Sequence, residues 1–90
     1  MSVQLAADEH QNQRKSLRTK LHCAVVTVIA ASRREVGMTQ EDLAHRLGWH
    51  RSRIAKIEST ERRIDVPDFI SIANGLNIEP GILLGRVLRW

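Results

Sequence analysis

The sequence is short of aromatic residues and of cysteine. It has no tyrosine, two tryptophans and one phenylalanine, so a hydrophobic core must be largely aliphatic. Because Cys23 is the only cysteine, the chain cannot form an internal disulfide bond, and nothing in it points to an oxidising compartment. The low aromatic content, together with a hydrophobic fraction of 42%, favours a small helical globular protein.

Long hydrophobic segments are lacking as well. The longest nearly apolar run, Cys23 to Ala31, is too short to span a bilayer. The first residues do not show the basic-then-apolar order of a secretory signal. We therefore expect no contact with a membrane and a cytoplasmic location.

The residue spacings that metal sites and catalytic centres require are also missing. No two candidate ligands stand at the i, i+4 or C-x-x-C spacing that brings them together; the candidates are His10, His22, Cys23, His45 and His50. The carboxylates at 8–9 and 41–42 are adjacent, so their side chains diverge on a helix, and no nucleophile, base and orienting group assemble. We expect no metal, no cofactor and no enzymatic activity.

What the chain does have is positive charge. Its 14 Lys and Arg residues exceed its 10 Asp and Glu residues, and the net charge of +4 favours a polyanionic partner. Ninety residues suffice for one small domain with a single modest core. Residues 1–16 are polar and mixed in charge, which predicts an N-terminal arm, either flexible or a frayed helix. Residues 17–90 are predicted to form the folded domain.

Apolar residues at helical spacing predict five helices in residues 17–90, and no segment shows strand-like alternation. The first helix begins at Leu17 and ends at Gly37, with an apolar stripe formed by Leu21, Val25, Val28, Ile29, Ser32 and Val36. A fourth helix is capped by Asp65 and ends at Gly75. Its apolar positions are Phe69, Ile70, Ile72, Ala73 and Leu76.

The second and third predicted helices, residues 40–47 and 51–58, are short and follow each other closely. Thr39 and Asp42 form a start like a capping box for the first of them. Gly48 ends that helix, because the tight reversal after it needs a residue that tolerates a positive φ.

The last predicted helix, which starts at Glu79, is more apolar than one packing face requires. Its apolar residues are Ile82, Leu83, Leu84, Val87 and Leu88. The surplus predicts a partner, because an exposed apolar end of a chain is costly. The candidates for contact with a second copy or with a protein partner are Leu84, Val87, Leu88 and Trp90.

The third predicted helix lies within the stretch LGWHRSRIAKIE, residues 47–58, and has two different faces. Ile54 and Ile57 stand at i, i+3 and point to one side. Arg51, Ser52 and Lys56 point largely the other way. One face of this helix therefore suits a core, and the other suits an anion.

Two short helices joined by Gly48-Trp49-His50, the second carrying basic and small polar residues outward, form a helix-turn-helix pattern. The segments GMTQEDLAHRLGWHRSRIAKIE and FISIANGLNIEPGILL resemble the Cro/repressor-type, XRE-like helix-turn-helix family of bacterial and phage transcriptional regulators. The resemblance covers about residues 24–84. It implies an all-α, five-helix domain of the lambda-repressor-like DNA-binding type, here with an N-terminal extension.

The resemblance also implies roles for individual residues. It makes residues 51–58 the recognition helix, with Arg51, Ser52 and Lys56 facing base edges. Arginine can donate a bidentate pair of hydrogen bonds to guanine, lysine can donate to the same acceptors, and serine can form hydrogen bonds with several bases. Ala55 is small enough to allow close approach or to touch a thymine methyl group.

The resemblance implies that other residues contact the DNA backbone or stabilise the protein itself. Gln40 occupies a family position that bonds to a phosphate. Arg33 and Glu58 match a structural ion pair that fixes how the recognition helix is presented. Non-specific attraction to the DNA strand is expected from Arg53, Arg62 and Arg63.

Two residues depart from the family pattern. His50 stands where Ser or Thr usually caps the recognition helix, so the cap is expected to be weaker or the helix to begin differently. Trp49 replaces a small apolar residue in the turn, where it is either packed or exposed.

We therefore expect a transcriptional regulator that binds operator DNA as a symmetric dimer and represses by occluding a promoter. The alternative is a protein-binding module of the same fold that sequesters an activator or neutralises a toxin. The extra N-terminal segment and the apolar C-terminus favour the alternative. The basic third helix opposes it, because a module that binds only protein does not need Arg51 and Lys56 there.

Overall fold

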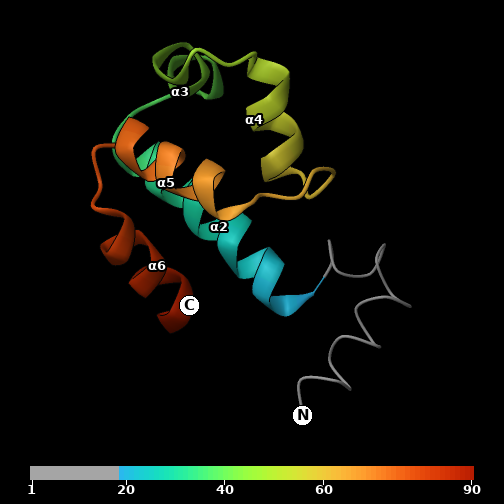
Figure 1. Ribbon diagram of the computed structural model, residues 1–90, viewed down its shortest axis with the longest axis vertical. Helices are drawn as coiled ribbons and strands as arrows, with labels where there is room; N and C mark the ends of the chain where they lie inside the picture. Colours follow the sequence, from blue (N-terminus) through green and yellow to red (C-terminus); the bar gives the residue numbers. More distant parts are fainter. Residues whose placement is uncertain (1–18) are drawn as a thin grey trace.

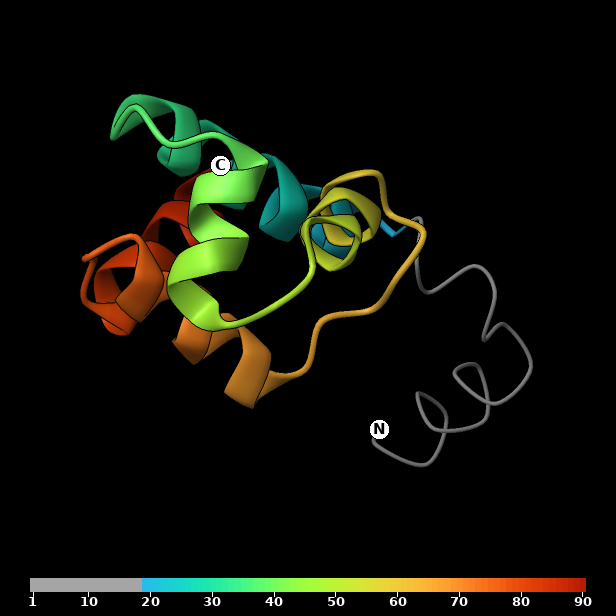
Figure 2. The same cartoon turned by 90° about the horizontal axis from the view of Figure 1, so that it is seen from above.

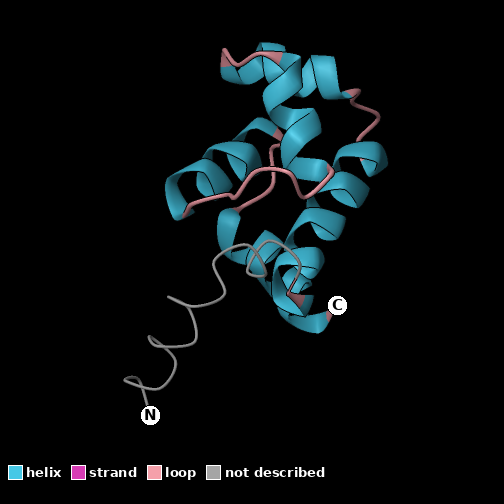
Figure 3. Ribbon diagram, turned by 90° about the vertical axis from the view of Figure 1, so that its right-hand side faces the viewer, coloured by secondary structure: helices cyan, strands magenta, loops and turns pink. Residues whose placement is uncertain are grey.

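The computed structural model describes residues 19–90, which form five helices (Figure 1). They are α2 (Lys20–Glu35), α3 (Gln40–Leu47), α4 (Arg51–Glu58), α5 (Val66–Gly75) and α6 (Pro80–Arg89). Within this part of the chain there is no strand, so the all-α, five-helix prediction is confirmed (Figure 3). The predicted N-terminal arm, residues 1–16, lies outside the described residues.

One aliphatic core joins all five helices. Each helix contributes a side chain that is fully buried: Ile29, Leu43, Ile57, Ile72 and Leu83. α2 packs against α4 and α6, whereas α3 packs against α4 and α5. Figure 1 shows the consequence: α3 and α4 lie at one end of the molecule, and α6 lies at the other.

Side-chain caps define most helix starts. Thr39 Oγ1 accepts from the Asp42 amide at 3.0 Å, and Asp42 Oδ2 accepts from the Thr39 amide at 2.9 Å, so the predicted capping box is present. Hydrogen bonding to the Asp42 carboxylate, first from the Thr39 backbone amide and second from the Thr39 side chain, lowers the pKa of Asp42. Asp65 caps α5 through the Asp68 amide, as expected from the sequence. Local polar residues therefore determine where α3 and α5 begin.

The C-terminal ends of α3 and α5 come close together at Gly75. A Cβ atom there would lie 2.9 Å from Leu47 Cδ2 and 3.0 Å from Leu43 Cδ1, which is too close for carbon atoms. Arg46 Nη1 donates to the Gly75 carbonyl oxygen at 3.0 Å across the same contact. A larger residue here would force the ends of the Leu43 and Leu47 side chains to shift, so glycine suits the close approach of the two helices.

The predicted apolar stripes are partly wrong. Leu21 and Val36, at the two ends of α2, are 63% and 47% exposed, because the other described helices do not cover these ends. Ile70 is 41% exposed on the outer side of α5. Val87, predicted as a partner contact, is instead buried in the core, because α6 turns this side chain toward α2.

The other apolar side chains at which a partner contact is predicted, and their neighbour Ile82 on α6, are exposed. Ile82, Leu84 and Leu88 are 55%, 47% and 72% exposed, and Trp90 is 65% exposed at the end of the chain. No helix among the described residues has the length and the apolar character needed to cross a membrane.

Candidate nucleic-acid interface

α4 presents the two faces that its sequence predicts. Ile54 and Ile57 are buried in the core. Arg51, Ser52 and Lys56 are exposed, and Ala55 between them is half-buried. Within residues 19–90, neither Arg51 nor Lys56 forms an ion pair, so both cations are available to a ligand.

A tight turn sets α4 against α3 (Figure 2). Gly48 ends α3 in the left-handed conformation, with φ of 70°. The amide of Trp49 then bonds to the Ala44 carbonyl oxygen at 2.8 Å. The chain passes through Gly48, Trp49 and His50 and enters α4 at Arg51. The geometry is that of a helix-turn-helix.

A nearly buried ion pair fixes the C-terminal end of α4. Arg33 Nε and Nη2 donate to the two Glu58 carboxylate oxygens at 2.7 and 2.9 Å, a bidentate contact. Arg33 Nη1 also donates to the Met38 carbonyl oxygen at 2.7 Å. The hydrogen bond to Glu58 raises the pKa of Arg33. The structure therefore brings Arg33 and Glu58 together and ties α2 to α4.

Gln40 joins the same cluster. Its Nε2 donates to Glu58 Oε1 at 3.0 Å, so α3 is tied to α4 as well. An amide nitrogen carries two hydrogens, and this contact uses one of them. The half-buried Gln40 can therefore hold Glu58 and still offer a hydrogen to a phosphate.

The role expected for Arg53 stays a prediction, but its side chain has partners within the protein. Its Nη2 donates to Asp68 Oδ1 at 2.8 Å, and its guanidinium lies 3.7 Å from the centre of the Trp49 ring. The Arg53 side chain is paired and stacked, yet 29% of it is still exposed. The packing of Trp49 also decides the alternative left open by the sequence: this side chain is packed, not an exposed handle.

Arg62 and Arg63 lie in the loop between α4 and α5, and both are exposed. The amides of Glu61 and Arg62 bond to the Lys56 carbonyl oxygen, which fixes the start of the loop to the end of α4. Arg63 lies close enough to α2 to affect His22, whose pKa is lowered first by burial and second by the Arg63 charge. The structure thus places both arginines, exposed, in the loop that follows α4.

The match to known proteins agrees with this geometry. A family model described as helix-turn-helix matches residues 29–83, which is more than half of the chain. The chain belongs to the XRE-type helix-turn-helix family. It is a DNA-binding transcriptional regulator of that family. No curated protein shows significant similarity to it.

Solved structures of helix-turn-helix proteins are similar over most of the chain. An XRE-family like protein from Pseudomonas syringae pv. tomato str. DC3000 is 32% identical, with a TM-score of 0.75, and the match covers 87% of this chain and 95% of that one. The wild-type restriction-modification controller protein C.Esp1396I is 31% identical, with a TM-score of 0.75, over 79% of this chain and 91% of that one. The same controller was also solved as a tetramer in complex with its natural 35-base-pair operator, with 31% identity, a TM-score of 0.75, and coverage of 79% of this chain and 93% of that one.

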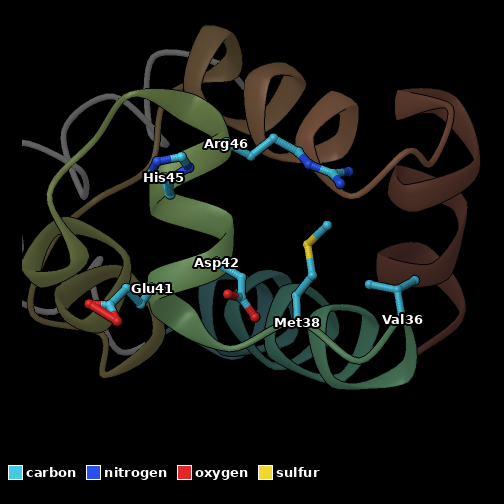
Figure 4. Close-up of a pocket in the computed structure, with 6 residues that line it drawn as sticks. All are labelled: Val36, Met38, Glu41, Asp42, His45 and Arg46. Carbon is cyan, nitrogen blue, oxygen red and sulfur yellow. The ribbon is translucent and has the colours of Figure 1, made fainter.

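A hollow on the other side of the helix-turn-helix lies between α3 and the end of α2 (Figure 4). Val36, Met38, Glu41, Asp42, His45 and Arg46 line it. Its carboxylates would repel a nucleic acid, so it is not part of the basic surface. Within residues 19–90, no group of three or more His, Cys, Asp and Glu side chains could hold a metal ion.

The start of α4 lacks a side-chain cap. His50 occupies the N-cap position and makes no capping hydrogen bond, as the departure from the family pattern predicts. Replacing His50 with serine is expected to raise the free energy of unfolding by about 1 kcal/mol, because a hydroxyl oxygen can accept from the first-turn amides. Urea unfolding followed by circular dichroism measures the change.

The matched control for this prediction is Thr39→Ala, which removes an existing cap of the same kind from α3. It is expected to lower the free energy of unfolding by about 1 kcal/mol. A His50→Ser variant no more stable than the parent chain would show that the first turn of α4 gains nothing from a cap.

Proposed function

We propose that this regulator binds a specific operator sequence by placing α4 in the major groove. The observation that carries the proposal is that Arg51, Ser52 and Lys56 are exposed on the outer face of α4, and that neither cation forms an ion pair within residues 19–90. These side chains match the hydrogen-bonding groups of base edges, where each good contact discriminates by about 1–3 kcal/mol. Ala55 would lie against the groove floor.

The surrounding residues would hold the DNA backbone. Gln40 would donate its second amide hydrogen to a phosphate at the start of α3, where the helix dipole also favours an anion. Arg62 and Arg63 would add attraction that does not depend on sequence. The operator complex of the similar controller C.Esp1396I supports double-stranded DNA as the ligand.

We further propose a symmetric dimer that acts as a repressor. The exposed side chains of Leu84 and Leu88 on α6, and of Trp90 directly after it, give an apolar surface for a second copy. Two recognition helices would then read half-sites about 10 bp apart, or a multiple of that spacing. Bound across a promoter in the cytoplasm, such a dimer would block transcription.

In vitro selection of random DNA duplexes at near-physiological salt tests this function. Enrichment of a paired, inverted motif is expected. A single unpaired motif would retain sequence-specific binding and exclude the dimer. Absence of enrichment with a folded chain would favour the alternative in which the protein binds a partner protein.

Replacing Arg51 with alanine is expected to weaken binding to the selected sequence by about 1–3 kcal/mol and to relax the preference at one base position. Fluorescence anisotropy on selected and random duplexes measures both effects. Arg63→Ala is the matched variant, because it removes the same charge from a backbone contact. This variant is expected to weaken binding to both duplexes equally and to lower the salt dependence of binding, expressed as its slope, by about one. Equal losses on both duplexes for Arg51→Ala would contradict its role as a base reader.

A further inference from the structure

Arg53 is the centre of a cluster that joins three parts of the molecule. Trp49 belongs to the turn, Arg53 to the first turn of α4, and Asp68 to the first turn of α5. The guanidinium stacks on the Trp49 ring and donates to Asp68 Oδ1 at 2.8 Å. The Arg53 Nε atom is also shielded from solvent, with no hydrogen-bond partner among the described residues. The side chain, 29% exposed, is therefore held by contacts within the protein.

This cluster supplies a connection that backbone packing does not. α4 packs mainly against α2 and α3, and its contact with α5 is slight. Among the described residues, the bond between Arg53 and Asp68 is the one side-chain hydrogen bond that joins the recognition helix to α5. It bridges residues 15 apart in sequence.

The cluster also complements the ion pair at the other end of α4. Arg33 and Gln40 hold Glu58, the last residue of the helix. Arg53 holds the first turn, where His50 provides no cap. Fixing a helix at both ends defines its direction, and base contacts require side chains held to within about 0.5 Å of their productive positions. Arg51 and Ser52, two of the proposed base readers, lie directly before Arg53 in this first turn.

We infer that Trp49, Arg53 and Asp68 form a brace that sets the orientation of α4 toward DNA, so that Arg53 and Asp68 are specificity-determining positioning residues that touch no DNA. The inference rests on the proposed function, because orientation matters only if α4 reads bases. It assigns a role in DNA discrimination to a carboxylate on α5, an element with none of the proposed DNA contacts.

The substitution Asp68→Asn distinguishes two possible roles of Arg53, because each role predicts a different change in DNA binding. If Arg53 were a phosphate contact, loss of the neighbouring negative charge would release it and tighten binding to every sequence. If the brace orients α4, the same substitution lowers the ratio of affinities for selected and random duplexes. We expect this ratio to fall by up to about tenfold, because an amide oxygen can still accept from Arg53 but no longer carries the charge that strengthens the bond.

Arg53→Met and the double variant complete the test. Arg53→Met is expected to lower the affinity ratio by a similar factor and to leave the salt slope of binding unchanged, because no phosphate contact is lost. The double variant is expected to lower the affinity ratio no further than either single variant does, because both substitutions affect the same interaction. Arg89→Met, an exposed cation at the end of α6, is the control for loss of charge and should leave the affinity ratio unchanged.

Three results would overturn the brace. They are unchanged affinity ratios in both single variants, a salt slope lowered by about one in Arg53→Met, and tighter binding of both duplexes by Asp68→Asn. Circular dichroism of each variant before titration ensures that only folded protein is compared. Failure of the proposed function is seen separately, in the parent chain, as equal affinity for every duplex.

Discussion

Replacing Arg33 with methionine is expected to lower the free energy of unfolding by about 3–5 kcal/mol. The Arg33 and Glu58 side chains are only 9% and 6% exposed, so their charges have little access to water. Removal of the guanidinium leaves the Glu58 carboxylate with Gln40 as its remaining side-chain hydrogen-bond donor. An uncompensated buried charge is the main source of the loss. Urea unfolding measured by circular dichroism gives its size.

Two further variants separate the charge effect from the loss of packing. Arg34→Met changes the neighbouring arginine, which is exposed, and is expected to alter stability by less than about 0.5 kcal/mol. The double variant Arg33→Met, Glu58→Leu removes both charges and is expected to recover part of the loss, because no carboxylate remains buried without its partner. If Arg33→Met lowers the free energy of unfolding by less than about 1 kcal/mol, the ion pair between Arg33 and Glu58 does not contribute strongly to stability.

Replacing Ile57 with alanine is expected to lower the free energy of unfolding by about 2–5 kcal/mol. Ile57 is fully buried and belongs to the core contributed by α4. Truncation removes apolar contacts and leaves a cavity that the surrounding helices fill only in part. Because α4 is also the proposed recognition helix, the variant should lose affinity for the selected duplex in proportion to its unfolded fraction.

Val66→Ala is the matched control for this core substitution. Val66 is also β-branched but is 70% exposed at the start of α5, so its truncation is expected to change stability by less than about 0.5 kcal/mol. The denaturant dependence of both variants should equal that of the parent chain, because the surface exposed on unfolding is nearly the same. Similar losses at the two positions would mean that Ile57 does not lie in the core.

The helix ends were the part of the fold that the sequence predicted best. Thr39, Asp65 and Gly48 act on backbone groups within four residues of themselves, so their signals are complete in a short stretch of chain. The buried face of α4 could be predicted for a similar reason. Ile54 and Ile57 alternate with polar residues at helical spacing, and no other segment is needed to assign their side of the helix.

Tertiary placement was harder to predict. The partner of Arg53 is Asp68, which stands on another helix and has no local signal that selects it over other carboxylates. Val87 and Leu88 look alike in the sequence, yet the direction from which α2 meets α6 buries one and exposes the other. Leu21 and Val36 continue an apolar stripe past the point where neighbouring helices cover α2. In each case the missing information is the position of a second element.

The close crossing of α3 and α5 at Gly75 has a consequence for how this protein can evolve. Any side chain there would have to displace the ends of Leu43 and Leu47, two side chains of α3. Arg51, Ser52 and Lys56 are exposed instead, so they can be exchanged without disturbing the core. We expect descendants of this chain to acquire new operator sequences through those surface positions, while residue 75, which contacts no base in our proposal, stays glycine.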